Sequence, residues 1–304
     1  MVTFVYSPSY YCDIGQHVFP VEKFRLLYER LKADPTFARA RFLPPTPVTP
    51  DDLRLVHTKE YIQDILAYRH TERTRDSELP ISEQIINAYI IGTGGTILAA
   101  EEALASLSGD KSSGGMNLTG GFHHAFPDHA EGFCYINDIA VAIRKLQLEQ
   151  KIKRAFVVDC DLHQGNGTAY IFRNDPDVFT FSIHQEDLYP RKQKSTLDIG
   201  LADHTGDEEY LGLLERHVPG IMERFKPDIV FYLAGADPYE GDQLGSLRLT
   251  RKGLKKRDEI VFGECVKHGV PVCVLVAGGY AFHTEDTIEI HVNTCRALMD
   301  IFGR

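Results

Sequence analysis

The sequence lacks the features that mark nucleic-acid-binding, membrane-spanning and secreted proteins. It has no excess of positive charge, because 33 Lys and Arg residues stand against 43 Asp and Glu residues, which gives a formal net charge of −10. This balance excludes binding to nucleic acid or to an anionic membrane through bulk charge. The chain also has no run of about 18 apolar residues and no basic segment followed by an apolar one at its start. We therefore expect no membrane span and no signal peptide.

The cysteines form no CxxC pair and no closely spaced framework, which argues against a disulfide scaffold in a chain of this length. We expect reduced thiols and a cytoplasmic location, or a nuclear one if the source is a eukaryote. The six residues are Cys12, Cys134, Cys160, Cys265, Cys273 and Cys295.

The composition is that of a soluble globular protein with a large core, since 43% of the residues are hydrophobic and 25% are charged. No internal repeat, low-complexity tract or linker-like stretch interrupts the chain. We therefore predict a single domain that spans residues 1–304. The sequence leaves the oligomeric state open.

Short apolar runs alternate with longer segments of helical spacing. Continuous apolarity over four to eight residues is typical of strands that are buried on both faces. The predicted strands are residues 3–6, 155–158, 178–183, 228–233 and 270–276, and the predicted helices are residues 81–106, 137–150, 207–224, 250–268 and 284–302. Residues 33–52, 70–80 and 186–204 are expected to be loops. This alternation predicts the α/β class, as an open, mostly parallel sheet with helices on both faces.

Polar clusters follow three of the predicted strands, and a fourth cluster follows residues 116–119. Because ligands bind beyond the carboxyl ends of parallel strands, we expect these clusters to meet at one edge of the sheet. They are residues 120–124, 159–167, 234–237 and 277–280.

Two of the clusters together offer a candidate metal site. If the strand before Asp159 continued, Asp159, Asp161 and His163 would point the same way. Asp161, His163 and Asp237 form a mixed oxygen and nitrogen ligand set that suits Zn²⁺ and leaves a position open for water. The alternative is that each aspartate only caps the following helix, which four clusters at one edge disfavour.

Further residues of these clusters suit acid–base chemistry. His123 and His124 follow two glycines, and imidazoles titrate close enough to neutrality to take and return a proton. Tyr280 follows Gly278 and Gly279 and could donate a hydrogen bond to a developing oxyanion, although a lone loop tyrosine more often only packs on its neighbours. Residues 132–135 could be simple core or could line an apolar tunnel.

The segments resemble, in this order, those of the zinc-dependent histone deacetylase family with the arginase/deacetylase fold, and the resemblance covers nearly the whole chain. Two segments are most similar to class IV, the histone deacetylase 11 type. The first is residues 163–167, with Gln164 where most classes carry a second histidine, and the second is residues 240–245. The matching segments are residues 120–124, 132–138, 159–167, 234–242 and 278–280.

The resemblance implies a role for each matching residue. Asp161, His163 and Asp237 would hold one Zn²⁺, His123 and His124 would be the acid–base pair, and Tyr280 would polarise the acyl carbonyl. Asp159 would orient His123 and form, with Ser182, a monovalent-cation site for K⁺. Asn166 stands where some classes have an aspartate facing the second histidine, which leaves the division of labour between the histidines open. Gly132 and Phe133 would flank the substrate channel, with Tyr189 at its rim.

The implied activity is zinc-dependent hydrolysis of an amide, which removes an acetyl or longer fatty acyl group from the ε-amine of acyl-lysine in a protein or peptide. The alternative on the same scaffold is deacetylation of polyamines or other small N-acyl amines. The length of the acyl chain stays open. A noncatalytic module that keeps zinc only structurally is disfavoured because a candidate exists for every catalytic role.

Three other readings are weaker. A two-manganese, arginase-like site would need further bridging carboxylates, and none follows Asp237 at the required spacing. Residues 92–96 resemble a phosphate-binding loop, but they lie in a helical pattern with Ile97 where the motif needs glycine, so close helix packing explains them better. The basic run at residues 251–257 could be a docking patch, but we expect it to be a solvated helix face.

Overall fold

The computed structural model describes residues 2–106 and 112–303, whose strands form one sheet. All seven strand pairings are parallel, in the order β2-β1-β3-β8-β7-β4-β5-β6. The strands are β1 (Thr3–Val5), β2 (Arg41–Leu43), β3 (Gly114–Asn117), β4 (Ala155–Asp159), β5 (Val178–Gln185), β6 (Leu197–Leu201), β7 (Ile229–Leu233) and β8 (Val272–Leu275). The predicted α/β class with a parallel sheet is confirmed.

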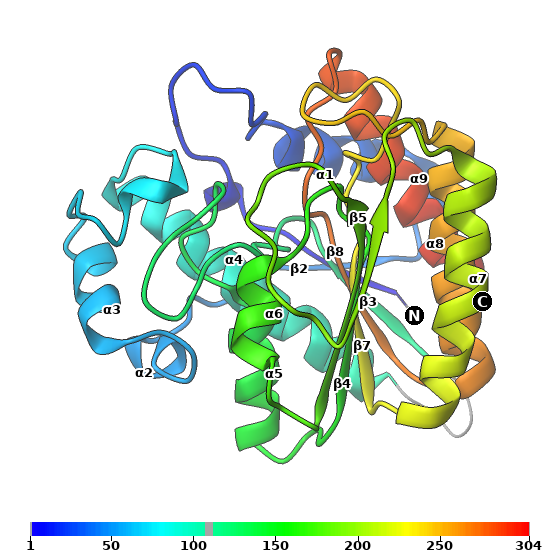
Figure 1. Ribbon diagram of the computed structural model, residues 1–304, viewed down its shortest axis with the longest axis horizontal. Helices are drawn as coiled ribbons and strands as arrows, with labels where there is room; N and C mark the ends of the chain where they lie inside the picture. The colour runs from blue at the N-terminus through cyan, green and yellow to red at the C-terminus, as the bar shows by residue number, and fades with distance from the viewer. Residues whose placement is uncertain (1, 107–111, 304) are drawn as a thin grey trace.

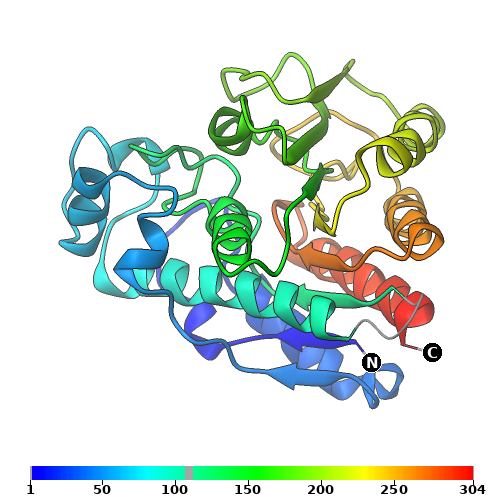
Figure 2. The same ribbon diagram turned by 90° about the horizontal axis from the view of Figure 1, so that it is seen from below.

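Helices cover both faces of this sheet. In Figure 1, α4, α5 and α6 lie on one side and α7, α8 and α9 on the other, and Figure 2 shows the same layers from below. The helices are α1 (Lys23–Ala33), α2 (Pro50–Leu53), α3 (Lys59–Leu66), α4 (Glu83–Ala105), α5 (Asp138–Leu148), α6 (Asn166–Phe172), α7 (Asp207–Phe225), α8 (Arg251–His268) and α9 (Thr284–Phe302). None of these described helices combines the length and apolar composition needed to cross a bilayer.

Local side-chain caps mark where the long helices α4 and α8 begin. The Ser82 hydroxyl accepts a hydrogen bond from the Ile85 amide at the start of α4, and Thr250 does the same for the Gly253 amide in α8. Helix α8 is followed directly by Gly269, whose φ of +66° suits a residue without a side chain. Each end of the five predicted helices lies within two residues of the observed end.

Two segments expected to be loops contain strands of the sheet, which corrects those predictions. Strand β2 lies within residues 33–52 and β6 within residues 186–204, and they form the two edges of the sheet. Neither edge strand is continuously buried, so their sequences lack the unbroken apolar run that marks the central strands. Helix α2 also begins within the first of these segments, at Pro50.

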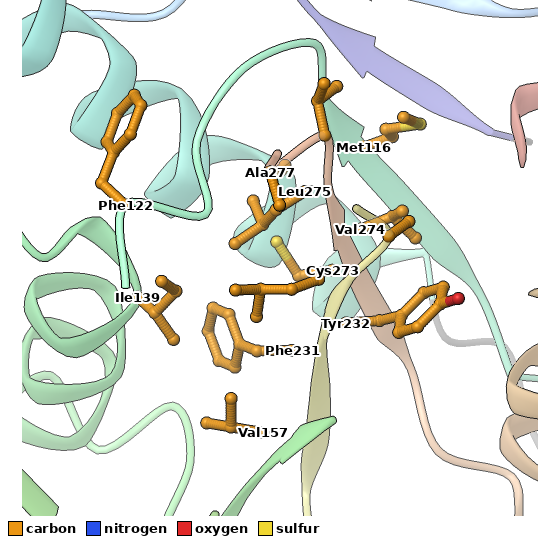
Figure 3. Packing of buried hydrophobic residues seen from close by; sticks show 14 of the residues in the cluster. Met116, Phe122, Ile139, Val157, Phe231, Tyr232, Cys273, Val274, Leu275 and Ala277 are labelled. Carbon is orange, nitrogen blue, oxygen red and sulfur yellow. The ribbon is translucent and has the colours of Figure 1, made fainter. Parts of the chain in front are cut away.

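The core is centred on the inner strands. Val157 of β4 pairs with Phe231 of β7, which pairs with Cys273 of β8. These side chains point toward Ile139 of α5, as Figure 3 shows, while Tyr232 points to the opposite face. All five are at most 1% exposed. This burial on both faces is what holds the carboxyl ends of the strands at fixed positions.

Glycines in α4 let the helix lie directly against neighbouring segments. A Cβ atom at Gly94 would collide with the backbone oxygen of Thr46, and one at Gly95 would collide with the Tyr10 hydroxyl. These glycines are buried within a continuous helix. The prediction that residues 92–96 serve close helix packing is thus confirmed.

The close approach at Gly94 can be tested with a matched pair of helix variants. Gly94→Ala is expected to lower the free energy of unfolding by about 1–3 kcal/mol, because the added methyl group overfills the contact. Gly263→Ala in α8 has open space around its Cβ position and should raise the free energy by roughly 0.5–1 kcal/mol. Urea unfolding followed by circular dichroism measures both. Equal stability of the Gly94 variant and the wild type would contradict the contact.

Candidate active site

Asp161, His163 and Asp237 converge where β4 and β7 end. All three are buried, and one potential ligand atom from each lies within 4.8 Å of the others. The His163 Nδ1 atom is 3.3 Å from Asp161 Oδ1 and 3.4 Å from Asp237 Oδ2. Over the described residues, this is the one cluster of three such side chains with metal-ligand spacing. A single cluster disfavours a two-metal site.

The ligands converge through turns rather than along a strand, which corrects the expectation of a continuing strand. Strand β4 ends at Asp159. The Asp161 amide then donates to Asp159 Oδ1 over 3.1 Å, and the His163 amide donates to Asp161 Oδ1 over 3.0 Å. Each aspartate thus folds the chain back so that the residue two positions on faces the same point.

Backbone amides orient the two carboxylates. The Gly278 amide donates to Asp161 Oδ2 over 2.8 Å, and the Leu162 amide donates to Asp237 Oδ1 over 3.1 Å. The other oxygen of Asp237, Oδ2, is buried and has no hydrogen-bond partner among the described residues. An unpaired buried carboxylate oxygen is costly unless a cation contacts it.

The charges in this cluster also favour a cation. Burial and then the charge of Asp161 raise the pKa of Asp237 to about 7. Burial opposes protonation of His163, but its hydrogen bond to Asp161 and the nearby charge of Asp237 outweigh that effect and raise its pKa to about 10. The protein alone leaves the two carboxylates short of positive charge. A divalent ion bound by two carboxylates and one imidazole would supply it, and this mixed donor set suits zinc.

The two adjacent histidines have different partners. His123 Nδ1 lies 2.7 Å from Asp159 Oδ2, whereas His124 Nδ1 lies 2.8 Å from Asn166 Oδ1. Their Nε2 atoms are 3.1 Å apart. Burial lowers the pKa of His123, but the nearby aspartates more than offset this and raise it to about 9. Burial and the charge of His123 keep the pKa of His124 well below its usual value. The surroundings therefore favour the charged form of His123 and the neutral form of His124.

Tyr280 lies on a turn whose backbone makes hydrogen bonds to side chains of other segments. The Tyr280 amide donates to Asp242 Oδ2 over 2.7 Å, and the buried ammonium of Lys23 donates to the Ala277 oxygen over 2.8 Å. Burial and the charges of Asp161 and Asp237 raise the pKa of the Tyr280 phenol well above its usual value. The hydroxyl therefore stays protonated and can donate a hydrogen bond.

The predicted channel residues border the cavity above these groups. A cavity of about 320 Å³ is lined by Gly132, Phe133 and Tyr189 together with His124, His163 and Tyr280. A smaller cavity of about 30 Å³ shares Gly132, Phe133 and Tyr280 with it and is also lined by both adjacent histidines and Asp161. Ser182 lies outside both cavities, on β5 beside Asp159. The remaining candidates, Asp159, Asn166 and Asp237, line neither cavity but contact the histidines that do.

One prediction about charge is wrong: Arg257 is not on a solvated face. It is completely buried and donates to the backbone oxygens of Cys160 and Gly235, over 3.2 and 2.6 Å. It also contacts the carboxylate of Asp258 at 2.9 Å. These carbonyls lie next to the metal-ligand turns, so the guanidinium ties both turns to α8.

The helical spacing of the apolar residues in α8 predicts that Arg257 is buried, which the count of basic residues alone does not show. Arg257 shares its helix face with Leu254 and Val261, three residues before it and four after it, and both are buried. Residues at this spacing line one side of a helix. By the same spacing Lys252 and Lys256 lie on the exposed side.

Comparison with known proteins gives the family. The model of the histone deacetylase domain matches residues 17–295, and the chain therefore belongs to the histone deacetylase family. An uncharacterized protein of Picosynechococcus sp. is 39% identical over 301 residues, which cover 98% of each chain. Histone deacetylase 2 of Arabidopsis thaliana is 29% identical, over 92% of this chain and 74% of that one. A probable deacetylase of Archaeoglobus fulgidus is 30% identical, over 92% and 82%.

Comparison with solved structures gives the same fold. The crystal structure of a histone deacetylase homologue complexed with SAHA matches with a TM-score of 0.81 and 25% identity, over 100% of this chain and 84% of that chain. The HD domain of HDA15 shares the fold, with a TM-score of 0.81 and 22% identity over 99% of this chain and 92% of that one. The predicted resemblance is confirmed at the level of the family and the fold.

Two arginines of α8 test the importance of the buried contact. Arg257→Met removes the partner of a buried carboxylate and should lower the free energy of unfolding by about 3–5 kcal/mol. Arg251→Met removes an exposed pair with Asp286 and should cost at most about 1 kcal/mol. Urea unfolding of both variants measures the difference. Similar small losses would show that Arg257 is not needed to balance Asp258.

Proposed function

We propose that this protein is a zinc-dependent deacylase that hydrolyses the amide bond of N-acyl-lysine. The observation that carries the proposal is the convergence of Asp161, His163 and Asp237, since His163 also lines the cavity that presents His124 and Tyr280. The family of the chain supports deacetylase chemistry. The proposal adds the metal, the substrate and the residue roles.

The three ligand side chains would hold the ion, and the remaining groups would handle the substrate. Zinc would supply a Lewis acid that polarises the acyl carbonyl and makes water more acidic. His124 presents an uncharged ring that can accept a proton, and His123 is held by Asp159 in position to deliver one to the departing amine. Tyr280 can donate a hydrogen bond to the carbonyl oxygen as negative charge develops there. The products are a free amine and a carboxylate.

The channel walls would position the chain of the substrate. Phe133 and Gly132 border the cavity together with Tyr189, so an extended aliphatic segment would pass between an aromatic ring and backbone. Glu78 lies at the same cavity. An acidic group there is the feature that a cationic substrate requires, which keeps acetylated polyamines as the second candidate.

Several finer predictions accompany this proposal. We propose that residues 1–304 form one catalytic domain of class IV type, located in the cytoplasm. The six cysteines, all within the described part of the chain, are free and buried, which supports a reducing compartment. The potassium site at Asp159 and Ser182 stays a prediction.

Substrate and metal dependence can be tested in one assay. A lysine peptide that carries an acetyl or a myristoyl group is incubated with zinc-loaded protein, with and without a chelator, and acetylspermidine is run in parallel. We expect release from at least one lysine peptide and its loss with the chelator. Hydrolysis of acetylspermidine alone would favour the polyamine activity, and turnover unaffected by complete zinc removal would contradict the metal mechanism.

Residue variants separate the oxyanion role from metal binding. Tyr280→Phe should lower kcat by about 10²–10³-fold while the zinc content stays the same, because the phenol is not a ligand. His163→Ala should lose the metal, as measured by the zinc-to-protein ratio after dialysis. Tyr68→Phe, at an exposed position outside the cavity, serves as the control with unchanged activity. Full activity of Tyr280→Phe would rule out its proposed role.

A further inference from the structure

Asn166 connects His124 to a carboxylate that the catalytic roles above do not use. Its Nδ2 atom donates to Glu131 Oε1 over 2.9 Å, and its Oδ1 atom lies 2.8 Å from His124 Nδ1. Glu131 thus reaches the histidine through the asparagine. Glu131 is partly buried, with 20% of its side chain exposed, and it also accepts a hydrogen bond from the Tyr189 hydroxyl over 3.2 Å.

These contacts decide which end of the asparagine amide faces the histidine. An ionised carboxylate only accepts hydrogen bonds, so the NH₂ group of Asn166 must face Glu131. The Gly167 amide, which only donates, independently requires oxygen on the other side, since it contacts Asn166 Oδ1 at 3.0 Å. Both constraints place the amide oxygen against His124 Nδ1.

The orientation of the amide in turn decides the tautomer of His124. An amide oxygen accepts, so Nδ1 of the neutral ring must carry the hydrogen and donate it. The lone pair is then left on Nε2, which lies 3.1 Å from His123 Nε2 within the inner cavity. Only in this tautomer can His124 accept a proton inside the cavity, either from water or from the neighbouring His123 Nε2.

We propose that Glu131 is a positioning residue that fixes the tautomer of His124 through Asn166. This inference rests on the proposed deacylase function and deepens it. Glu131 supplies, one residue further out, the negative charge that an aspartate at position 166 would supply directly. The carboxylate polarises the Asn166 amide and strengthens the hydrogen bond that its oxygen accepts from the histidine.

The local chain geometry explains why position 131 can do this. The Glu131 amide donates to the Cys134 oxygen over 3.2 Å, which closes a tight turn. Gly132 and Phe133 within the turn both have positive φ, of 50° and 61°. The turn directs Phe133 to the channel and places the Glu131 carboxylate beside Asn166. The channel wall and the support of the histidine are therefore built from one turn.

Exchanging the two side chains gives a sharp test. Glu131→Gln removes the charge that orients the amide, and Asn166→Asp places two carboxylates in contact. Each single variant should lower kcat about tenfold, the scale typical of a lost outer partner of an active-site histidine, with little change in KM. The double variant Glu131→Gln/Asn166→Asp restores one carboxylate and one amide in exchanged positions and should recover most of the activity. A double variant no better than the singles would overturn the proposal.

A direct readout does not depend on turnover. The ¹⁵N chemical shifts of His124 in the zinc-loaded wild type should report hydrogen on Nδ1, and Glu131→Gln should show a mixture of tautomers. His129→Gln removes a neighbour 3.7 Å from the other Glu131 oxygen, lies outside both cavities and should leave kcat and the tautomer unchanged.

The outcomes separate the two levels of inference. A wild-type ring protonated on Nε2, or unchanged kcat and tautomer in Glu131→Gln, would overturn the role of Glu131 while leaving the deacylase proposal intact. Failure of the wild type to bind zinc and to cleave any acyl-lysine peptide would overturn the proposed function instead. The tautomer of His124 would still be measurable in that case.

Discussion

The burial of several carboxylates at one edge of the sheet is the constraint on which the pocket depends. Asp159, Asp161 and Asp237 are each at most 3% exposed, and buried charges are costly unless other groups compensate them. Backbone amides and the rings of His123 and His163 meet part of this requirement, and a bound cation would meet the rest. The turns around the pocket have their shapes because each must bring a donor to one of these oxygens.

Two further compensating groups come from helices that both pack against α9. Arg257 extends from α8 beneath the ligand turns, where Asp258 balances its charge and in turn accepts hydrogen bonds from Tyr232 and Thr294. Lys23 extends from α1 to the turn that carries Tyr280. A polar network within the apolar core therefore supports the turns that carry the candidate metal ligands, and a shift of α1 or α8 would move these turns.

The sequence predicted the parts of the molecule that are continuous along the chain. Buried strands followed by polar clusters identified Asp161, His163, Asp237 and both histidines. The edge strands were missed because half-exposed strands lack an unbroken apolar run. The supporting side chains were missed for another reason: Lys23 and Ala277 are 254 residues apart, and Glu131 acts only through its place beside Asn166. Such contacts are properties of the tertiary fold, which residue spacing does not encode.

The order of the strands also bears on how the pocket arises during synthesis. Strand β8 is the last of the described strands along the chain, yet it lies in the middle of the sheet between β3 and β7. A growing chain thus has two separate strand sets until β8 emerges. The set with β4 and β7 already carries the three metal ligands, whereas the histidine pair follows β3 and the tyrosine follows β8. A nascent chain can therefore bring its candidate metal ligands together before the pocket exists, and the pocket is complete only when the central strand joins the two halves.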